Sequence, residues 1–303
     1  MAWGLALSGG GILGAAHLGV LRALDEWGLQ PDTLAGASAG GLAAGVVATG
    51  AGLDALLEYG RAVSRAPLRY LRPRAFSLLA EILPEDPLPP ADSLFDSGPL
   101  VAGLLALCPE GAHTLRHWRV PTALTAVDLA NGEAVAFVRR PATGIVAPRG
   151  RWRAVEDADL ATALQATMAM PGVYTPVRKE GAFLVDGGVA DTLPVDWAAA
   201  LGASRVVAVD VSPASPGVPE RAGILWSLAE SAAYATATLS ALRRPRFAPV
   251  LTLTPDTRGV PAFAFSAFDR LVEAGYAEAV RRREEVLAFV GSPPLASRAP
   301  VQA

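Results

Sequence analysis

Short runs of hydrophobic residues alternate along this chain with longer stretches in which apolar residues recur every three or four positions. Residues 3–7 form the first uninterrupted apolar run, which ends at a group of glycines. Such a run is typical of a short strand buried on both faces. Between residues 14 and 27 the apolar residues instead recur at intervals that place them on one face of a helix. Gly28 follows, and glycine is the residue most suited to end a helix.

The same alternation continues to the end of the chain. Further strands are predicted at residues 33–36, 122–127, 134–138, 183–185, 205–211 and 250–253. Further helices are predicted at residues 39–49, 53–64, 159–168, 194–201, 224–242 and 268–289. Because strands alternate with helices, we expect an α/β fold: a mainly parallel central sheet with helices on both faces, in three layers. We find no internal repeat or linker, so residues 1–290 are expected to form one domain.

Two segments depart from this pattern. Seven prolines lie between residues 67 and 99, which predicts an irregular insertion and a candidate cap over the entrance to a site. Residues 291–303 are rich in Pro, Ala and Ser, a composition typical of a disordered tail.

Composition excludes several classes of protein. Hydrophobic residues make up 51% of the 303 residues, enough for a large core, and the net charge of −3 argues against nucleic acid as a partner. The single cysteine, Cys108, excludes an internal disulfide and is expected to be a buried apolar residue. Residues 1–7 lack the basic start of a signal peptide. We therefore expect a cytoplasmic protein, with membrane contact limited to its surface.

Residues 34–53 carry no charge over 20 positions, the length of a transmembrane helix. The same run contains six glycines, which favours a buried strand, a turn and a closely packed helix. The transmembrane helix remains the less favoured alternative.

A G-x-S-x-G sequence lies at the turn between the predicted strand and helix of this run. It consists of Gly36, Ala37, Ser38, Ala39 and Gly40. A serine on a tight strand-to-helix turn is exposed to a substrate and lies at the helix N-terminus, where the partial positive charge favours an oxyanion. A purely structural turn is the alternative, because short glycine patterns are common in a chain rich in alanine and glycine.

A glycine-rich turn also follows the first predicted strand. It contains Gly9, Gly10, Gly11 and Gly14. Consecutive glycines allow backbone N–H groups to converge on an anion, as in an oxyanion hole. The same glycines match a dinucleotide-binding fingerprint, but that site needs an acidic residue at the end of the next strand. The next strand ends in Ala-Gly-Ala-Ser, so the oxyanion hole is favoured.

A third motif, Asp186 followed by Gly187 and Gly188, ends the predicted strand 183–185. Alone it is consistent with an ordinary turn. The histidines decide its interpretation, because a Ser-His-Asp hydrolase of the α/β type has its histidine last in the chain. Here the last 186 residues contain none. His17 is expected in the core, so a carboxylate is expected to replace the usual histidine base.

Together the three motifs, in this order and spacing, resemble the bacterial patatin-like phospholipase family over residues 4–290. The stretches at 166–171, 191–195 and 271–276 resemble it too. The resemblance implies an acyl hydrolase acting on a lipid or other ester. The sequence has no paired His or Cys spacing and no calcium loop, so neither a metal nor a cofactor is expected. The resemblance also implies that Ser38 attacks the acyl carbonyl, that Asp186 is the base, and that the glycine-rich turn binds the oxyanion. A catalytically inactive lipid-binding homologue remains the alternative.

The chain departs from the family pattern at two positions. Leu13 stands where the family usually has Arg, which removes a charge and bears on head-group preference. Thr192 stands where Asn is common, which is expected to loosen the loop that carries Asp186. Separately, arginines cluster beside the proline-rich insertion, either as a solvated face or as a surface for anionic lipid head groups. They are Arg61, Arg65, Arg69, Arg72 and Arg74.

Overall fold

The computed structural model describes residues 2–75, 91–139, 152–212, 248–261 and 263–291, with a few isolated positions between 223 and 238. The middle of the proline-rich insertion, most of the predicted helix 224–242 and the tail beyond residue 291 lie outside the described residues. The prediction of one domain over residues 1–290 stays a prediction.

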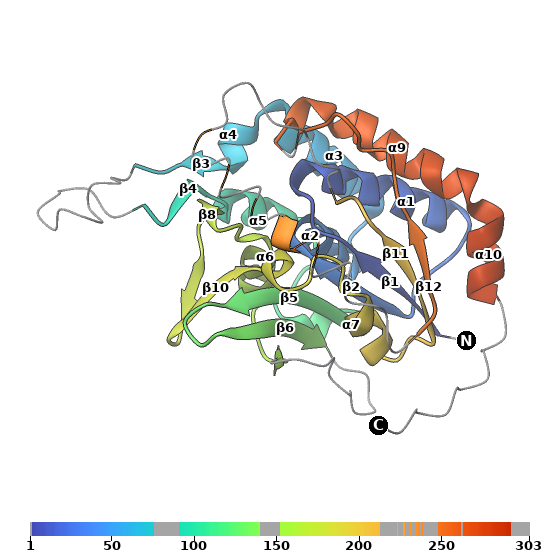
Figure 1. Cartoon of the computed structure of the whole chain (residues 1–303), viewed down its shortest axis with the longest axis horizontal. Coiled ribbons are helices and arrows are strands. Elements are labelled where there is room, and N and C mark those ends of the chain that lie inside the picture. Colours follow the sequence, from blue (N-terminus) through green and yellow to red (C-terminus); the bar gives the residue numbers. More distant parts are fainter. Residues whose placement is uncertain are drawn as a thin grey trace, which may run out of the picture.

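A central sheet runs through the molecule (Figure 1). Its main strands, in spatial order, are β12 (Val250–Leu253), β11 (Arg205–Val209), β1 (Trp3–Leu7), β2 (Thr33–Ala37), β5 (Thr122–Asp128), β10 (Ala182–Asp186) and β9 (Val177–Lys179). The strands from β12 to β5 are all parallel, which confirms the predicted mainly parallel sheet. On the other edge of β5, β6 (Glu133–Arg139) pairs antiparallel, and β7 (Trp152–Val155) continues the sheet.

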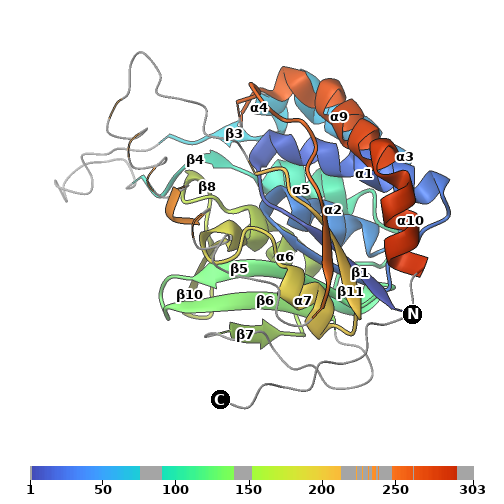
Figure 2. The same ribbon diagram turned by 45° about the vertical axis from the view of Figure 1, so that its right-hand side comes forward.

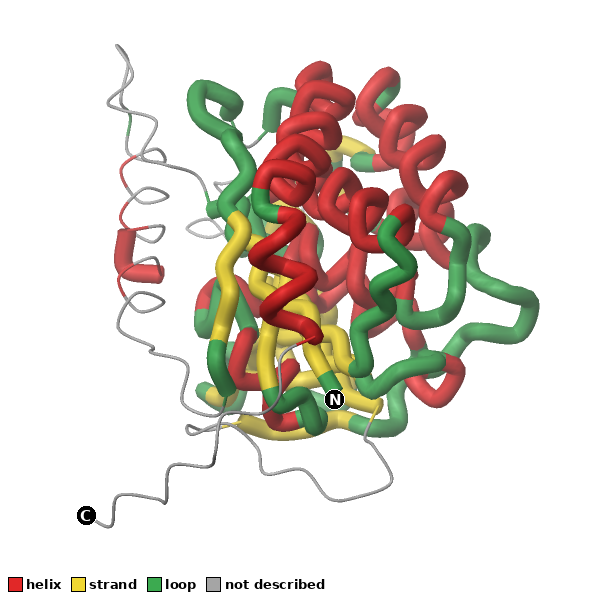
Figure 3. The backbone as a smooth tube through the Cα atoms, turned by 90° about the vertical axis from the view of Figure 1, so that its right-hand side faces the viewer, coloured by secondary structure: helices red, strands yellow, loops and turns green. Residues whose placement is uncertain are grey.

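Helices cover both faces of the sheet, as Figures 1 and 3 show. The larger layer contains α1 (Ala15–Glu26), α2 (Ser38–Val47), α3 (Leu53–Arg65), α5 (Gly98–Leu105), α6 (Leu160–Met168) and α9 (Phe268–Arg281). The other face is covered by α7 (Val195–Ala200). Side chains of β1 alternate between the two cores: Leu5 and Leu7 belong to the larger one, whereas Ala6 between them belongs to the one that contains Trp197 of α7.

Two different strands share one edge of β5. The first half of β5 pairs parallel with β2, up to the pair Ala37–Thr125. The second half pairs antiparallel with β10, and the last pair is Asp186–Ala126. Since the two strands approach each other along the same edge, their final residues lie beside neighbouring positions of β5. The residue after Ala37 is Ser38, so the pairing alone brings Ser38 and Asp186 together.

A small second sheet lies beyond this junction. It consists of β3 (Arg72–Pro73), β4 (Ser93–Asp96) and β8 (Gly172–Tyr174), next to the short helix α4 (Pro67–Tyr70). Sequence patterns did not predict these elements, because strands of two to four residues are too short to show periodicity. Among the described residues, four single turns of 3₁₀ helix were also not predicted: η1 (Gly11–Gly14), η3 (Leu115–His117), η4 (Gly187–Val189) and η5 (Phe265–Ala267).

The chain after β12 ends in two helices where the sequence predicted one over 268–289. Helix α9 stops at Arg281, and α10 (Arg283–Gly291) continues in a different direction (Figure 2). Arg282 at the break leaves the helical backbone region, with φ −104° and ψ 16°. Its guanidinium donates a hydrogen bond of 2.8 Å to the carbonyl of Thr252 in β12. This tertiary contact anchors the bend, and no proline or glycine marks it in the sequence.

The uncharged run 34–53 forms β2, α2 and the start of α3. Across the described ranges, no helix has the length and apolar character that crossing a bilayer requires.

Candidate active site

Ser38 occupies a sharp turn between β2 and α2. Its φ of 53° is in the left-handed region, which non-glycine residues avoid at a penalty of about 1–2 kcal/mol. The turn is possible because its flanking glycines allow close backbone contact: a Cβ on Gly36 would lie 2.4 Å from the Gly40 carbonyl oxygen, and one on Gly40 would lie 2.3 Å from that of Leu7. A strained serine at the start of a helix has the geometry of a nucleophile elbow.

Thr167 holds this turn from the side of α6. The N–H of Ser38 donates a hydrogen bond of 3.1 Å to the Thr167 hydroxyl oxygen, and both residues are buried. Gly41 provides the room, because a Cβ there would lie 2.5 Å from the same oxygen. Sequence reasoning gave Thr167 no role. The available signal was a hydroxyl on the apolar face of a helix built mainly from alanine and leucine.

Asp186 lies at the end of β10 with 5% of its surface exposed. Its Oδ1 accepts a hydrogen bond of 2.7 Å from the Gly188 N–H. Gly187 lies tightly against β5, since a Cβ there would be 2.3 Å from the Thr125 carbonyl oxygen. Burial raises the pKa of Asp186 to about 6, and the Ser38 hydroxyl and the Gly188 amide oppose this shift by hydrogen bonding the carboxylate. At neutral pH Asp186 is thus a buried carboxylate with unusual proton affinity, within reach of Ser38.

The glycine-rich turn between β1 and α1 passes directly beside the nucleophile. A Cβ on Gly9 would lie 3.2 Å from the Ser38 Cβ. The Gly9 N–H donates a hydrogen bond of 2.9 Å to the Thr192 carbonyl, and Gly14 packs against Ala39 of α2. Gly10 and Gly11 are partly exposed, and within the described part of the chain their N–H groups have no backbone acceptor. Of the four glycines predicted to form an oxyanion hole, these two have amides open to a ligand.

The two departures from the family pattern lie in different surroundings. Leu13 is fully buried in the larger core, so its side chain does not reach a substrate. Thr192 connects two loops of the site. Its hydroxyl donates a hydrogen bond of 3.3 Å to the Gly188 carbonyl, and its own carbonyl accepts a hydrogen bond from the Gly9 N–H. This residue therefore ties the loop after Asp186 to the glycine-rich turn.

The three histidines lie elsewhere. His17 is fully buried, its Nε2 is 2.8 Å from the Ser8 carbonyl oxygen, and burial lowers its pKa to about 4. His113 and His117 are exposed near the start of α6, where the Leu160 N–H donates to the His113 carbonyl. Thr167, which bonds Ser38, lies seven residues after Leu160 on α6. At 1.5 Å per residue, about 10 Å of helix separate Thr167 from the end near these two histidines. In the described residues no hydrogen bond joins a histidine to Ser38 or Asp186.

The dinucleotide alternative lacks its acidic anchor. Asp32 is the acid adjacent to β2, but it precedes the strand and accepts the Trp3 N–H at 2.8 Å, at the opposite end of the sheet from Ser38. The described residues contain no group of three His, Cys, Asp or Glu side chains placed to bind an ion.

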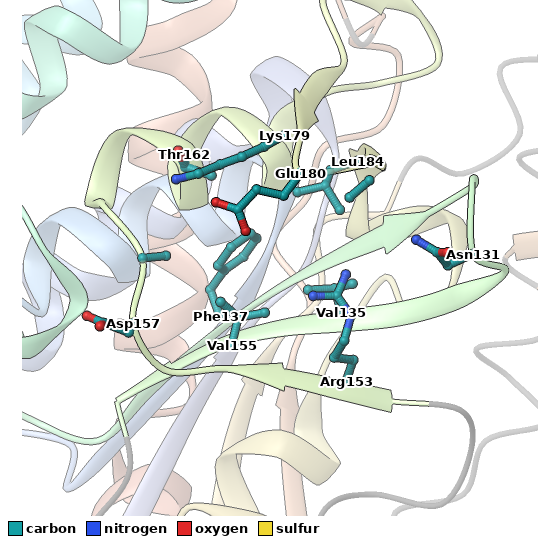
Figure 4. A pocket seen from close by; sticks show the side chains of 12 residues that line it. Asn131, Val135, Phe137, Arg153, Val155, Asp157, Thr162, Lys179, Glu180 and Leu184 are labelled. Atoms are coloured by element: carbon teal, nitrogen blue, oxygen red, sulfur yellow. The ribbon is translucent and has the colours of Figure 1, made fainter.

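A separate hollow of about 210 Å³ lies over β6 and β7 (Figure 4). Phe137, Val135 and Leu184 form its apolar part. Its two cations are already paired, Arg153 with Asp128 at 3.0 Å and Lys179 with Asp159 at 3.3 Å. Neither Ser38 nor Asp186 lines it, so it is not the site described above.

Comparison with known proteins shows the family of this chain. Residues 5–199 match the family model described as patatin-like phospholipase. The chain belongs to this family. The resemblance seen in the sequence is thereby confirmed, and the patatin-like match contains all three motifs.

Curated relatives of this patatin-like chain include an uncharacterised NTE family protein of Mycobacterium bovis, 31% identical over 214 residues, 70% of this chain and 50% of that protein. A lysophospholipase NTE1 of Mycosarcoma maydis is 31% identical over 211 residues, 70% of this chain and 10% of that protein. The patatin-like phospholipase domain-containing protein 6 of the mouse is 28% identical over 213 residues, 68% of this chain and 13% of that protein. The chain thus spans half the length of the mycobacterial relative and a much smaller share of the other two.

Among solved structures, VipD of Legionella pneumophila aligns with a TM-score of 0.45 at 14% identity, covering 94% of this chain and 67% of VipD.

Proposed function

We propose that this patatin-like chain is a serine acyl hydrolase in which Ser38 is the nucleophile and Asp186 is its general base. The observation that carries the proposal is the placement of a strained, buried serine beside a buried carboxylate whose pKa is raised to about 6. A base is most effective when its pKa lies near the working pH, and an ordinary aspartate at about 3.9 is a poor base at neutral pH. Burial of Asp186 corrects this mismatch without a histidine.

In the first step, the Asp186 carboxylate takes the proton of the Ser38 hydroxyl while Oγ attacks the ester carbonyl carbon. The resulting tetrahedral intermediate carries a negative charge on the former carbonyl oxygen. When it collapses, the C–O bond to the alcohol breaks and Asp186 returns the proton to the leaving oxygen. The products of this step are the free alcohol and an acyl group on Ser38.

The charge on the intermediate is stabilised by the N–H groups of Gly10 and Gly11. Both belong to the turn that passes beside Ser38, and both are free of backbone acceptors in the described residues. The N-terminus of α2, which starts at Ser38, adds partial positive charge. Losing a single oxyanion donor typically costs about 2.7–4 kcal/mol of barrier.

Hydrolysis of the acyl-enzyme repeats the chemistry with water. Asp186 takes a proton from the water that attacks the acyl carbonyl, and then protonates Ser38 as the fatty acid leaves. The same carboxylate serves both halves, so replacing it by an amide should stop both.

The substrate class proposed is the acyl ester of a phospholipid or lysophospholipid. The family description and the name of the Mycosarcoma maydis relative, a lysophospholipase, support this class. The relatives are longer proteins, so their whole activities are not assigned to this chain.

Contact with a lipid surface is part of the same proposal. In the arginine cluster, Arg61 pairs with Asp269 and Arg74 with Asp92. Arg65, Arg69 and Arg72 are exposed, and Leu68 on α4 between them is 62% exposed. Three cations around an exposed apolar side chain suit an anionic bilayer. Inactive Ser38→Ala protein should sediment with vesicles that contain phosphatidylglycerol more strongly than with neutral phosphatidylcholine vesicles, and equal sedimentation would remove this surface from the proposal.

The decisive experiment treats wild type, Ser38→Ala and Asp186→Asn with a fluorophosphonate probe and assays each against a panel of lipid esters. Wild type should be labelled and active, and Ser38→Ala should lose both properties while its thermal melt stays cooperative. Ser204→Ala is the matched control and should behave as wild type. Ser204 is exposed and its hydroxyl donates a hydrogen bond to the carbonyl of Ala2. A folded wild type that is neither labelled nor active would favour the inactive lipid-binding homologue instead.

A further inference from the structure

Ser8, the last residue before the glycine-rich turn, is fully buried and has no part in the mechanism above. Its hydroxyl nevertheless makes two hydrogen bonds. It accepts one of 2.9 Å from the N–H of Val211, and it lies 3.0 Å from the carbonyl oxygen of Gly9, to which it donates. Because the Val211 N–H occupies the hydroxyl as an acceptor, the single proton of Ser8 is left to point at Gly9.

The peptide that joins Ser8 and Gly9 is held at both ends. The Ser8 carbonyl lies 2.8 Å from Nε2 of the neutral, buried His17, which donates to it. The Gly9 N–H donates to Thr192. The peptide joining Ser8 and Gly9 therefore cannot rotate without breaking both hydrogen bonds and leaving buried polar groups unpaired.

The next peptide joins Gly9 and Gly10, and it is held at one end only. Its carbonyl is bound by the Ser8 hydroxyl, and its N–H has no backbone acceptor within the described residues. The bond is trans, so the carbonyl and the N–H point in opposite directions. Fixing the carbonyl toward the buried Ser8 therefore turns the Gly10 N–H away from the core. Glycines flank this peptide on both sides and offer little resistance to rotation.

We infer that Ser8 is a positioning residue for the oxyanion hole, whose hydroxyl fixes the direction of the Gly10 amide by holding the Gly9 carbonyl. This inference rests on the proposed function. An oxyanion donor contributes most when its direction is set before the reaction, so a freely rotating Gly10 peptide weakens the transition state more than the bound substrate.

The test uses Ser8→Ala in the full chain. Its kcat on a soluble ester should fall about ten- to a hundredfold, less than the full loss of a donor, with KM changed by less than about threefold. Affinity for a boronic acid analogue of the tetrahedral intermediate should fall in parallel with kcat. Affinity for a non-hydrolysable ether analogue of the substrate should stay the same. Ser8→Thr, which keeps the hydroxyl, should recover most of the activity.

Thr33→Val is the matched control. Thr33 is also buried and donates its hydroxyl to a backbone carbonyl, that of Ala198, at 2.9 Å, but it lies at the far end of β2. It should lose similar thermal stability and keep its kcat. If Ser8→Ala does not fold, Ser8→Cys, whose thiol is a weaker donor, should give an intermediate loss of kcat.

An unchanged kcat in Ser8→Ala would overturn the inference. So would a loss of kcat no larger than that of Thr33→Val, or a loss of affinity for the ether analogue that parallels the loss of kcat. Wild-type protein without esterase activity or fluorophosphonate labelling would instead refute the proposed function, so the two failures are distinguishable.

Discussion

Replacing Asp186 by Asn should make the protein more stable and inactive at the same time. The side chain keeps its shape, and its oxygen can still accept the Gly188 N–H. What disappears is the charge that burial opposes. Activity should fall by at least a hundredfold, the lower range for loss of a general base.

The magnitude follows from the pKa of Asp186. Its value rises from 3.8 to about 6 in the folded protein, a shift of about two units. At about 1.36 kcal/mol per unit, ionising the buried carboxyl lowers the stability of the wild type by at most about 3 kcal/mol. Between pH 4 and pH 6 the folded state binds more protons than the unfolded state, so wild-type stability falls as pH rises through this window. Above pH 6 the loss is complete and constant.

The measurement is the free energy of unfolding in urea for wild type and Asp186→Asn at pH 4 and pH 8. The two proteins should be nearly equal at pH 4, and the variant should be more stable by up to about 3 kcal/mol at pH 8. A gain of this size would raise the melting temperature by roughly 2–4 °C per kcal/mol.

Asp128→Asn provides a control with the opposite sign. Asp128 is also fully buried, but hydrogen bonds from Asn131 and from the Phe183 and Ala130 N–H groups outweigh its burial and lower its pKa. Arg153 would also lose one of its two carboxylate partners, since only Glu133 would remain. This variant should therefore lose stability at pH 8, with a smaller loss in acid. A destabilised Asp186→Asn at pH 8 would refute the assignment of a raised pKa.

Other expectations concern the same site. In wild type, kcat/KM should rise about tenfold per pH unit below pH 6 and level off above it, because Asp186 must be ionised; a rate that is flat from pH 4.5 to 8.5 would contradict this base. Thr167→Val leaves the buried Ser38 N–H without an acceptor, so melts should show a loss of about 1–3 kcal/mol and turnover should fall. Gly40→Ala places a Cβ 2.3 Å from the Leu7 carbonyl oxygen, so little folded protein should be recovered; normal yield and activity would show that the elbow can relax. EDTA should leave the rate unchanged, and inhibition that calcium reverses would contradict a mechanism without metal.

The features that the sequence predicted well depend on residues close together in the chain. The elbow needs small residues within two positions of Ser38, and the contacts at Gly36 and Gly40 show the same requirement in the structure. The parallel strands were predicted because each is a short segment made mostly of apolar residues. The family was predicted because three motifs occur in a fixed order.

The features that the sequence did not predict depend on contacts between distant segments. Thr167 reaches Ser38 across 129 positions, and Ser8 meets Val211 across 203. Neither residue stands out locally, because a serine or threonine among apolar residues has no distinctive spacing. The end of α9 is similar: no helix-breaking residue marks it, and Arg282 at the break bonds the Thr252 carbonyl, 30 positions away.

The arrangement in which β2 and β10 share one edge of β5 makes strand register the factor that sets the catalytic distance. Adding or deleting a residue within β10 would shift Asp186 along β5 and turn its side chain to the opposite face. A change in the length of the chain between β2 and β5 would have no such effect, because the pairings Ala37–Thr125 and Asp186–Ala126 would be kept. We therefore expect changes in length to be tolerated better in the connecting segments beyond the elbow than within these strands. Related chains can differ widely in their connecting segments and still bring the same two side chains together.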